Sequence, residues 1–259
     1  MNTSSLNVLL RDFKSQISQH KKELVVFTCV FMVLIVNRYF SETSNLITLL
    51  DTIGFEAYKE KAYSWFVNSE NSRFNSLLYW VGVLNFSYLV IPFLVIRFIL
   101  KESIKNFGFS FFIERNFRVY YPIFMVFMLV LVFFASKTSA FQEKYPFYKI
   151  HESSQLYPRF LIWELLYCTQ FFCLEFFFRG FMVKGLQHKF GLWSIVIMTI
   201  PYCMIHFGKP LPETIGSVFA GLILGYLSYK GKGIIPGFLM HITVALSMDV
   251  MALWQTNVL

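Results

Sequence analysis

Long apolar stretches separated by short polar segments are the dominant pattern of this chain. A helix that crosses a bilayer needs about 20 mostly apolar residues, and seven stretches approach or exceed that length. The pattern therefore predicts an all-α fold, a polytopic transmembrane bundle of about seven helices. The predicted helices cover residues 24–39, 76–100, 119–136, 160–182, 192–207, 211–229 and 234–254.

Two segments add detail to this picture. The fourth stretch has no proline before Gly191, so we expect its helix to continue to about His188, beyond the membrane. Segment 45–60 is shorter and less apolar, which is typical of an amphipathic helix lying on the membrane surface. Residues 1–23 are polar and of mixed charge, without the pattern of a cleaved signal peptide.

The composition excludes a soluble protein. The chain of 259 residues is 56% hydrophobic and 15% charged, whereas a soluble domain is about 45–50% apolar and about 25% charged. The same numbers exclude a disordered chain and a disulfide scaffold. The net charge of +8 contains no basic run dense enough for nucleic acid. The expected partner is therefore the lipid bilayer, and no nucleic acid.

The distribution of Lys and Arg predicts the orientation of the chain. With the N-terminus in the cytoplasm, the cytoplasmic segments are 1–23, 101–118, 179–191 and 230–233. Lys and Arg are denser there than in the segments on the other side, as the positive-inside rule expects. The pattern favours a cytoplasmic N-terminus and a C-terminus on the opposite face.

Ionisable side chains gather in the last hundred residues, inside predicted spans. Such groups are costly in lipid and usually have a function. Glu175 and Arg179 are four residues apart, so they share one helix face. His206 lies as far after the turn at Phe190-Gly191 as Glu175 lies before it. If the two helices are antiparallel neighbours, Glu175 and His206 come side by side at the same depth.

Three further residues complete the set of candidates. His241 lies about seven residues into the last predicted helix, and Asp249 follows two turns later. Glu213 comes after Gly208-Lys209-Pro210, a segment able to bend back over the site. A carboxylate beside an imidazole can activate water, and a second imidazole can stabilise the oxyanion that forms. The set suits hydrolysis of a bond presented within the membrane.

Structural roles explain the same residues without chemistry. Glu175 and Arg179 would then be an ion pair that holds the bundle together, and each histidine an interhelical hydrogen-bond partner. Glu213 would pair with Lys209 at the membrane interface, and Asp249, nearer a helix end, would be reached by water. The placement of two histidines and a carboxylate–arginine pair at comparable depth favours the catalytic hypothesis.

Three short motifs in the last hundred residues resemble those of a known family. Segment 174–180 (LEFFFRG) resembles the Glu-Glu-x-x-x-Arg motif of the CPBP intramembrane proteases. This group, also called ABI, contains the type II CAAX prenyl endopeptidases and their bacterial relatives. Segment 202–206 (YCMIH) is similar to the Phe-x-x-x-His motif, and 241–245 (HITVA) to the His-x-x-x-Asn motif. The glycine-bearing segment 221–226 (GLILGY) stands between them, as in the family.

The resemblance implies a glutamic-type intramembrane protease that works without a metal or another cofactor. If the roles of the matching family residues apply to this chain, Glu175 and His206 activate water and His241 stabilises the oxyanion. Two positions depart from the pattern, because Leu174 replaces the first Glu and Ala245 replaces the Asn. Either Glu213 or Asp249 supplies the missing polarity, or the chain is a catalytically inactive member that acts as a binding or immunity factor.

The resemblance also sets the expected organisation and location. It covers residues 160–254 as a protease core, while 1–159 form N-terminal helices and loops without a recognised signature. The expected substrate is a membrane-associated protein or peptide cut near its C-terminus, and the expected location is the bacterial cytoplasmic (inner) membrane. A proton-coupled transporter and a metal site of one Glu and two His are the remaining alternatives.

Overall fold

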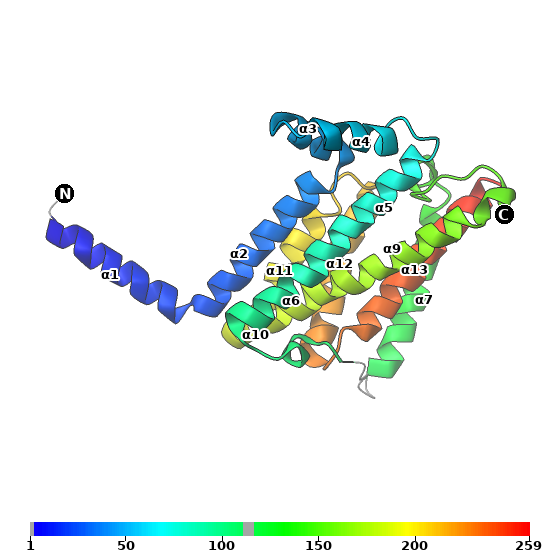
Figure 1. The fold of residues 1–259 in the computed structure, drawn as a ribbon. Coiled ribbons are helices and arrows are strands. Elements are labelled where there is room, and N and C mark those ends of the chain that lie inside the picture. The colour runs from blue at the N-terminus through cyan, green and yellow to red at the C-terminus, as the bar shows by residue number, and fades with distance from the viewer. Residues whose placement is uncertain (1–2, 111–116) are drawn as a thin grey trace.

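The protein is an all-α bundle of membrane-spanning helices. The computed structural model describes residues 3–110 and 117–259, and within these ranges it is 81% helical and contains no strand. Six of the described helices are long and apolar enough to cross a membrane. The predicted fold class is therefore confirmed (Figure 1).

The helices follow one another with short connections. In chain order, the α-helices are α1 (Thr3–Gln19), α2 (Lys21–Ile35), α3 (Thr43–Thr52), α4 (Glu56–Phe66), α5 (Ser72–Asn85), α6 (Ile91–Leu94), α7 (Phe117–Ala135), α8 (Ser139–Lys144), α9 (Arg159–Glu175), α10 (Gly185–Phe190), α11 (Trp193–Met204), α12 (Leu211–Lys230) and α13 (Ile235–Gln255). Wider π-helical turns continue several of them, at η1 (Val36–Phe40), η2 (Phe86–Val90), η3 (Val95–Leu100) and η6 (Phe176–Lys184), and short 3₁₀ turns form η4 (Ile104–Phe107) and η5 (Ser153–Leu156).

The candidate spans agree with six of the seven predicted stretches. They are Lys21–Phe40, Ser72–Leu100, Arg118–Ala135, Arg159–Phe190, Leu211–Lys230 and Ile235–Gln255. The fourth is a continuous helix of 32 residues formed by α9, η6 and α10. The expected continuation of this helix to about His188 is thus confirmed. Residues 111–116, in one of the segments expected in the cytoplasm, lie outside the described part.

The fifth predicted stretch is shorter than expected. Helix α11 has 12 residues, or about 18 Å at 1.5 Å per residue, which is less than a bilayer core. The chain turns back at Gly208, whose φ of +86° lies in the left-handed region that glycine adopts without strain. The hydroxyl of Thr214 on α12 then donates to the carbonyl oxygen of His206 at 2.9 Å. The turn between α11 and α12 is therefore tied to α12 by a hydrogen bond at His206.

Segment 45–60 forms parts of two helices. Helices α3 and α4 are joined at Gly54, which has a φ of +74°, and they lie across one end of the bundle (Figure 1). Their exposed aromatic side chains, Phe55, Tyr58 and Trp65, are typical of the membrane–water interface. The amphipathic hairpin takes the place of the single surface helix that the sequence predicted.

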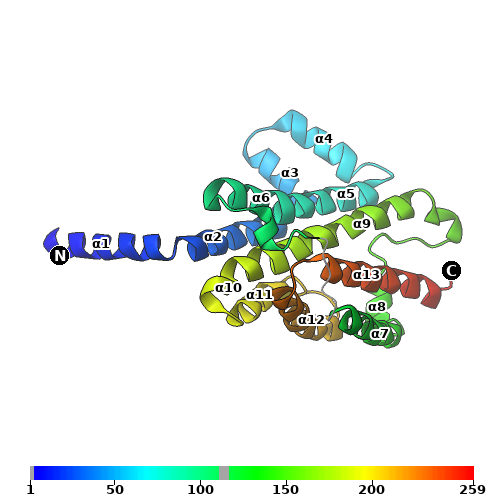
Figure 2. The same cartoon turned by 90° about the horizontal axis from the view of Figure 1, so that it is seen from below.

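The long helix formed by α9, η6 and α10 is the centre of the bundle. It is the most buried of the candidate spans, because 56% of an 18-residue stretch of this helix is buried inside the protein. Helix α9 lies between α5 on one side and α13 on the other (Figure 2). Four phenylalanines of η6 are fully buried and form much of the core: Phe176, Phe177, Phe178 and Phe181.

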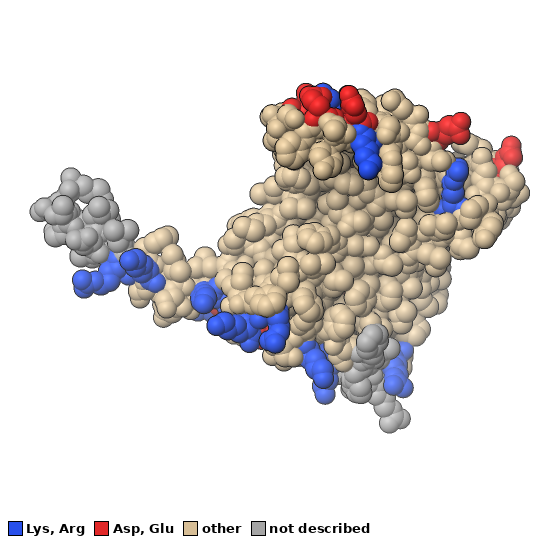
Figure 3. Space-filling model, viewed as in Figure 1, with Lys and Arg blue, Asp and Glu red and all other residues tan. Residues whose placement is uncertain are grey.

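Charged side chains gather at the two ends of the bundle. In Figure 3, Lys and Arg line the end at which α1 and α10 lie, and Asp and Glu gather over α3 and α4 at the other end. The two termini of the chain also lie towards opposite ends (Figure 1). This arrangement is the one that a cytoplasmic N-terminus would produce under the positive-inside rule.

Helices α11 and α12 pack closely through two glycines. A Cβ atom at Gly225 would lie 2.6 Å from Cγ2 of Ile195, and one at Gly221 would lie 2.8 Å from Cγ2 of Thr199. Small residues let helix backbones approach, which is how helices gain packing energy in lipid. The close approach fixes the position of α11, which carries Tyr202 and leads into His206.

We predict that Gly225→Ala destabilises the bundle. The added methyl group overlaps Ile195 and Met198, and overpacking of this kind costs about 1–3 kcal/mol. Thermal unfolding of the purified protein in detergent should therefore occur at a lower temperature. Gly216→Ala, on the same helix with no atom near its added Cβ, is the control and should leave the midpoint unchanged or raised. Equal midpoints for the two variants would contradict the close approach.

Candidate functional site

Glu175 is a buried carboxylate at the end of α9, where the helix widens into η6. It forms an ion pair with Arg179, in which Oε1 lies 3.0 Å from Nη1. Both side chains are 1% exposed. The four-residue spacing predicted this pair. A buried charge is costly unless an opposite charge lies beside it. The carboxylate and the guanidinium therefore depend on each other in the interior of the bundle.

The imidazole that meets Glu175 belongs to His241. Its Nδ1 lies 2.8 Å from Oε1 of Glu175, and its ring stacks on Phe171 with the centroids 5.6 Å apart. The sequence led us to expect His206 beside Glu175, but no contact recorded among the described residues joins those two side chains. Their equal distances from the turn between the helices fixed the depth of both residues, but not the rotation of α11 about its axis.

Gly237 makes room for the carboxylate. A Cβ atom at this position on α13 would lie 2.3 Å from Oε2 of Glu175, far inside the van der Waals contact distance. The glycine lies one turn before His241, so the same face of α13 supplies both the space for Glu175 and its imidazole partner. Helix α13 can therefore approach α9 closely at this depth.

Tyr202 connects the two histidines and the arginine. Its hydroxyl is 2.8 Å from Nε2 of His241, and its ring lies under the guanidinium of Arg179, with Cζ 4.0 Å from the centroid. Its backbone carbonyl accepts a hydrogen bond of 2.8 Å from Nδ1 of His206. The sequence placed this residue only at the start of a motif and assigned it no role. A tyrosine four residues before a histidine in a predicted span was the one signal available.

His206 is partly exposed at the end of α11. Because its Nδ1 donates to a carbonyl, the hydrogen of the neutral ring is on Nδ1, and Nε2 keeps a free lone pair. The ring packs edge-on against Tyr202 with the centroids 4.9 Å apart. His206 is thus oriented as a proton acceptor at the edge of the buried cluster.

Glu213 and Asp249 lie in two other polar groups. Glu213 accepts a hydrogen bond of 2.7 Å from the hydroxyl of Tyr145 and pairs with Lys209 at 2.6 Å. Asp249 is 2% exposed and lies beside Glu164, itself 7% exposed. No contact recorded among the described residues links Glu213 or Asp249 to the carboxylate of Glu175.

The two positions that depart from the family pattern hold apolar side chains that pack in the core. Leu174 is 5% exposed and belongs to the central apolar cluster around the phenylalanines of η6. Ala245 is 7% exposed and packs with Trp163 and Tyr167 of α9. Neither side chain brings a hydrogen-bonding group to the site, so its polar chemistry depends on the residues described above.

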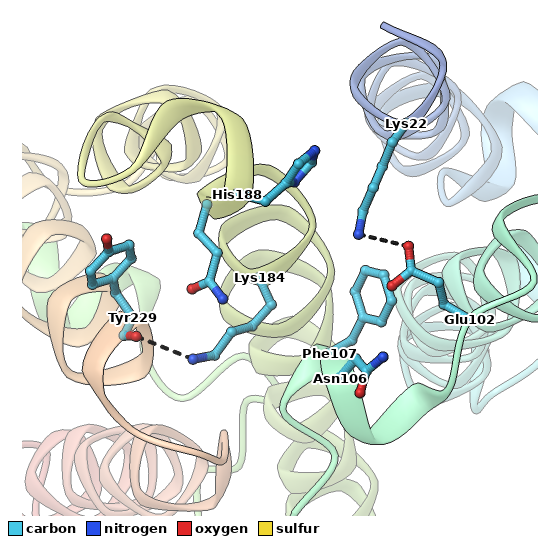
Figure 4. Close-up of a pocket in the computed structure, with 8 residues that line it drawn as sticks. Lys22, Glu102, Asn106, Phe107, Lys184, His188 and Tyr229 are labelled. Atoms are coloured by element: carbon cyan, nitrogen blue, oxygen red, sulfur yellow. Dashed lines mark hydrogen bonds and ion pairs between the residues drawn. The ribbon is translucent and has the colours of Figure 1, made fainter. Parts of the chain in front are cut away.

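A cavity of about 480 Å³ opens at the other end of the long central helix, beside α10. In Figure 4, Lys22 pairs with Glu102 across it, and Lys184 donates to the carbonyl oxygen of Tyr229. None of the six predicted site residues lines this cavity. Among the described residues there is also no group of three or more His, Cys, Asp or Glu that could hold a metal ion.

The comparisons with known proteins identify the region that carries the cluster. Residues 156–247 match the family model described as type II CAAX prenyl endopeptidase Rce1-like. No curated protein and no solved structure matches the chain. The match spans the segments of Glu175, Arg179, His206 and His241. The resemblance to the CPBP family is thereby confirmed over these residues, which are similar to the Rce1-like type II CAAX prenyl endopeptidases.

Proposed function

We propose that this protein is an intramembrane endopeptidase in which Glu175 and His206 activate water and His241 helps to stabilise the oxyanion. One observation carries the proposal: a carboxylate, a guanidinium and an imidazole meet in the interior of the bundle at 3.0 and 2.8 Å. The Rce1-like family implies CAAX-type intramembrane proteolysis in general. The residue roles and the substrate are the specific content of the proposal.

The reaction follows from the groups present. The water oxygen attacks the carbonyl carbon of the peptide, and its proton moves to Nε2 of His206, which holds a free lone pair. The negative charge of Glu175 favours the protonated imidazolium electrostatically. The tetrahedral intermediate then collapses, the C–N bond breaks, and His206 returns the proton to the leaving amine. Atoms and charges balance without any further reactant.

The substrate in this proposal is a membrane-associated protein or peptide, cut near its C-terminus. The protease itself would be located in a bacterial cytoplasmic membrane, with its N-terminus on the cytoplasmic side. The division of the chain into an N-terminal part, 1–159, and a protease core, 160–254, belongs to the same proposal. Glu213 and Asp249 are assigned supporting roles at most, because their carboxylates face Tyr145 and Lys209 or Glu164.

A non-catalytic membrane binding protein is the second candidate. It is favoured by Leu174 and Ala245, which leave two family positions without a polar group. In such a protein the Glu175–Arg179 pair would hold the helices together and nothing more. The two candidates differ in whether a conservative change at Glu175 alters the products found in the membrane.

We predict that Glu175→Gln lowers cleavage at least about 100-fold, because the charge of Glu175 supports the proton transfer to His206, and proton transfer of this kind contributes about 10²–10⁴ to a rate. Glutamine keeps the size of the side chain and an acceptor for Arg179 but removes the charge that pairs with it, so rates are expressed per folded protein. The assay is an internally quenched farnesylated CAAX peptide with the purified protein in phospholipid vesicles. Glu164→Gln is the matched control, a change of another buried carboxyl group on the same helix, and should retain activity.

His206→Ala tests the second group and should lose activity to a similar degree. Co-expression proteomics with the wild-type protein and the Glu175 variant would then search for C-terminally trimmed membrane proteins. Processing that is retained in both Glu175→Gln and His206→Ala would overturn the protease assignment and favour the binding protein.

We predict that Gly237→Ala abolishes activity with a smaller effect on folding than on the rate. The added methyl group would lie 2.3 Å from Oε2 of Glu175, so the carboxylate must move away from His241. The measurement compares the cleavage rate per folded protein with the amount of folded protein in size-exclusion chromatography. Normal cleavage by Gly237→Ala would mean that the position of Glu175 does not matter for the reaction.

A further inference from the structure

The hydroxyl group of Tyr202 is a polar group of the site that the proposed reaction does not yet use. The side chain is 2% exposed, and its hydroxyl lies 2.8 Å from Nε2 of His241. Buried hydroxyl groups normally form at least one hydrogen bond. The partner of this one is the histidine that contacts Glu175, which places Tyr202 directly in the cluster.

The position of the proton on His241 defines what Tyr202 does. Glu175 is ionised beside Arg179 and has no hydrogen to offer, so Nδ1 of His241, at 2.8 Å, carries the proton. A neutral imidazole has one N–H group, and here that group faces Glu175. Nε2 is therefore an acceptor, and the hydroxyl of Tyr202 donates to it. While His241 is neutral, its N–H faces Glu175, so its proposed part in stabilising the oxyanion requires the protonated ring, and the neutral site needs another donor.

The neighbouring donors are held in place by a hydrogen bond or by packing. Nδ1 of His206 donates to the carbonyl of Tyr202, and Arg179 is fully buried, with its guanidinium between Glu175 and the tyrosine ring. Ala245, one turn beyond His241, has no polar group. Among these residues, the hydroxyl of Tyr202 is the donor that can turn, because rotation about its C–O bond redirects the hydrogen without moving the ring.

We propose that the Tyr202 hydroxyl is a catalytic hydrogen-bond donor that stabilises the oxyanion. In the empty site it donates to Nε2 of His241. In the proposed reaction, on which this inference rests, it turns and donates to the carbonyl oxygen of the scissile peptide as that oxygen becomes negative. The hydrogen stays on the tyrosine oxygen throughout, so one hydrogen bond replaces another and no proton is transferred.

The rigid setting of the ring suits this role. The ring is held between the guanidinium of Arg179 at 4.0 Å and the edge of Phe178, whose centroid is 5.3 Å away. A donor that stabilises a transition state must be in position before the charge develops. Packing fixes the ring, and only the hydroxyl hydrogen is free to respond to the substrate.

The test is Tyr202→Phe, which removes the hydroxyl and keeps the ring. Loss of one oxyanion donor lowers kcat by about 10²–10³, and we expect a loss of that size with little change in KM. The assay is the farnesylated CAAX peptide in vesicles, with rates expressed per folded protein. Tyr88→Phe is the matched control, because Tyr88 is also 2% exposed and also packs against Phe178, at 5.8 Å.

The outcomes separate this proposal from the proposed function. Full activity of Tyr202→Phe, together with an inactive Glu175→Gln, would overturn the role of Tyr202 and leave the protease intact. A wild-type protein that cleaves no substrate would overturn both. If Tyr202→Phe and Tyr88→Phe lose the same activity and unfold at the same lowered temperature, the hydroxyl has only a structural role and the proposal fails.

Discussion

The buried ion pair between Glu175 and Arg179 is the constraint around which the bundle is organised. A charge in the interior of a membrane protein needs a partner at close range, and loss of one partner costs about 3–5 kcal/mol. The pair is 1% exposed on both sides, so neighbouring helices must cover it completely. The tyrosine of α11 covers the guanidinium, and the glycine of α13 opens space for the carboxylate.

The long central helix can carry this pair because apolar packing surrounds it. Four phenylalanines of η6 are fully buried, and two of them pack against Tyr88 of η2. A Cβ at Gly180 would lie 2.5 Å from the carbonyl oxygen of Phe107, so the segment before α7 also touches this helix. The N-terminal half of the chain, which carries no family motif, therefore forms part of the shell that holds the site.

The ionisable residues of the last hundred positions divide into three groups in space. One contains Glu175, Arg179 and His241, with Tyr202 joining them to His206. The second pairs Glu213 with Tyr145 and Lys209, and the third holds Asp249 beside Glu164. The division matters for mechanism, because a carboxylate that lies in another group does not replace a polar group missing at Leu174 or Ala245. The hydroxyl group of Tyr202 lies beside His241 and is therefore better placed to supply that polar group.

The sequence by itself determined the membrane character of the chain, six of its long helices and the Glu175–Arg179 pair, because apolar length and helical spacing are local properties. It also gave the continuation of the fourth helix and, through three short motifs, the family of the C-terminal region. Only the tertiary structure decided that His241, and not His206, meets Glu175, and that Tyr202 lies between the two histidines. Sequence spacing fixes the depth of a residue in a bundle, whereas its partner depends on the rotation and approach of neighbouring helices, which here are set by contacts at Gly221, Gly225 and Gly237.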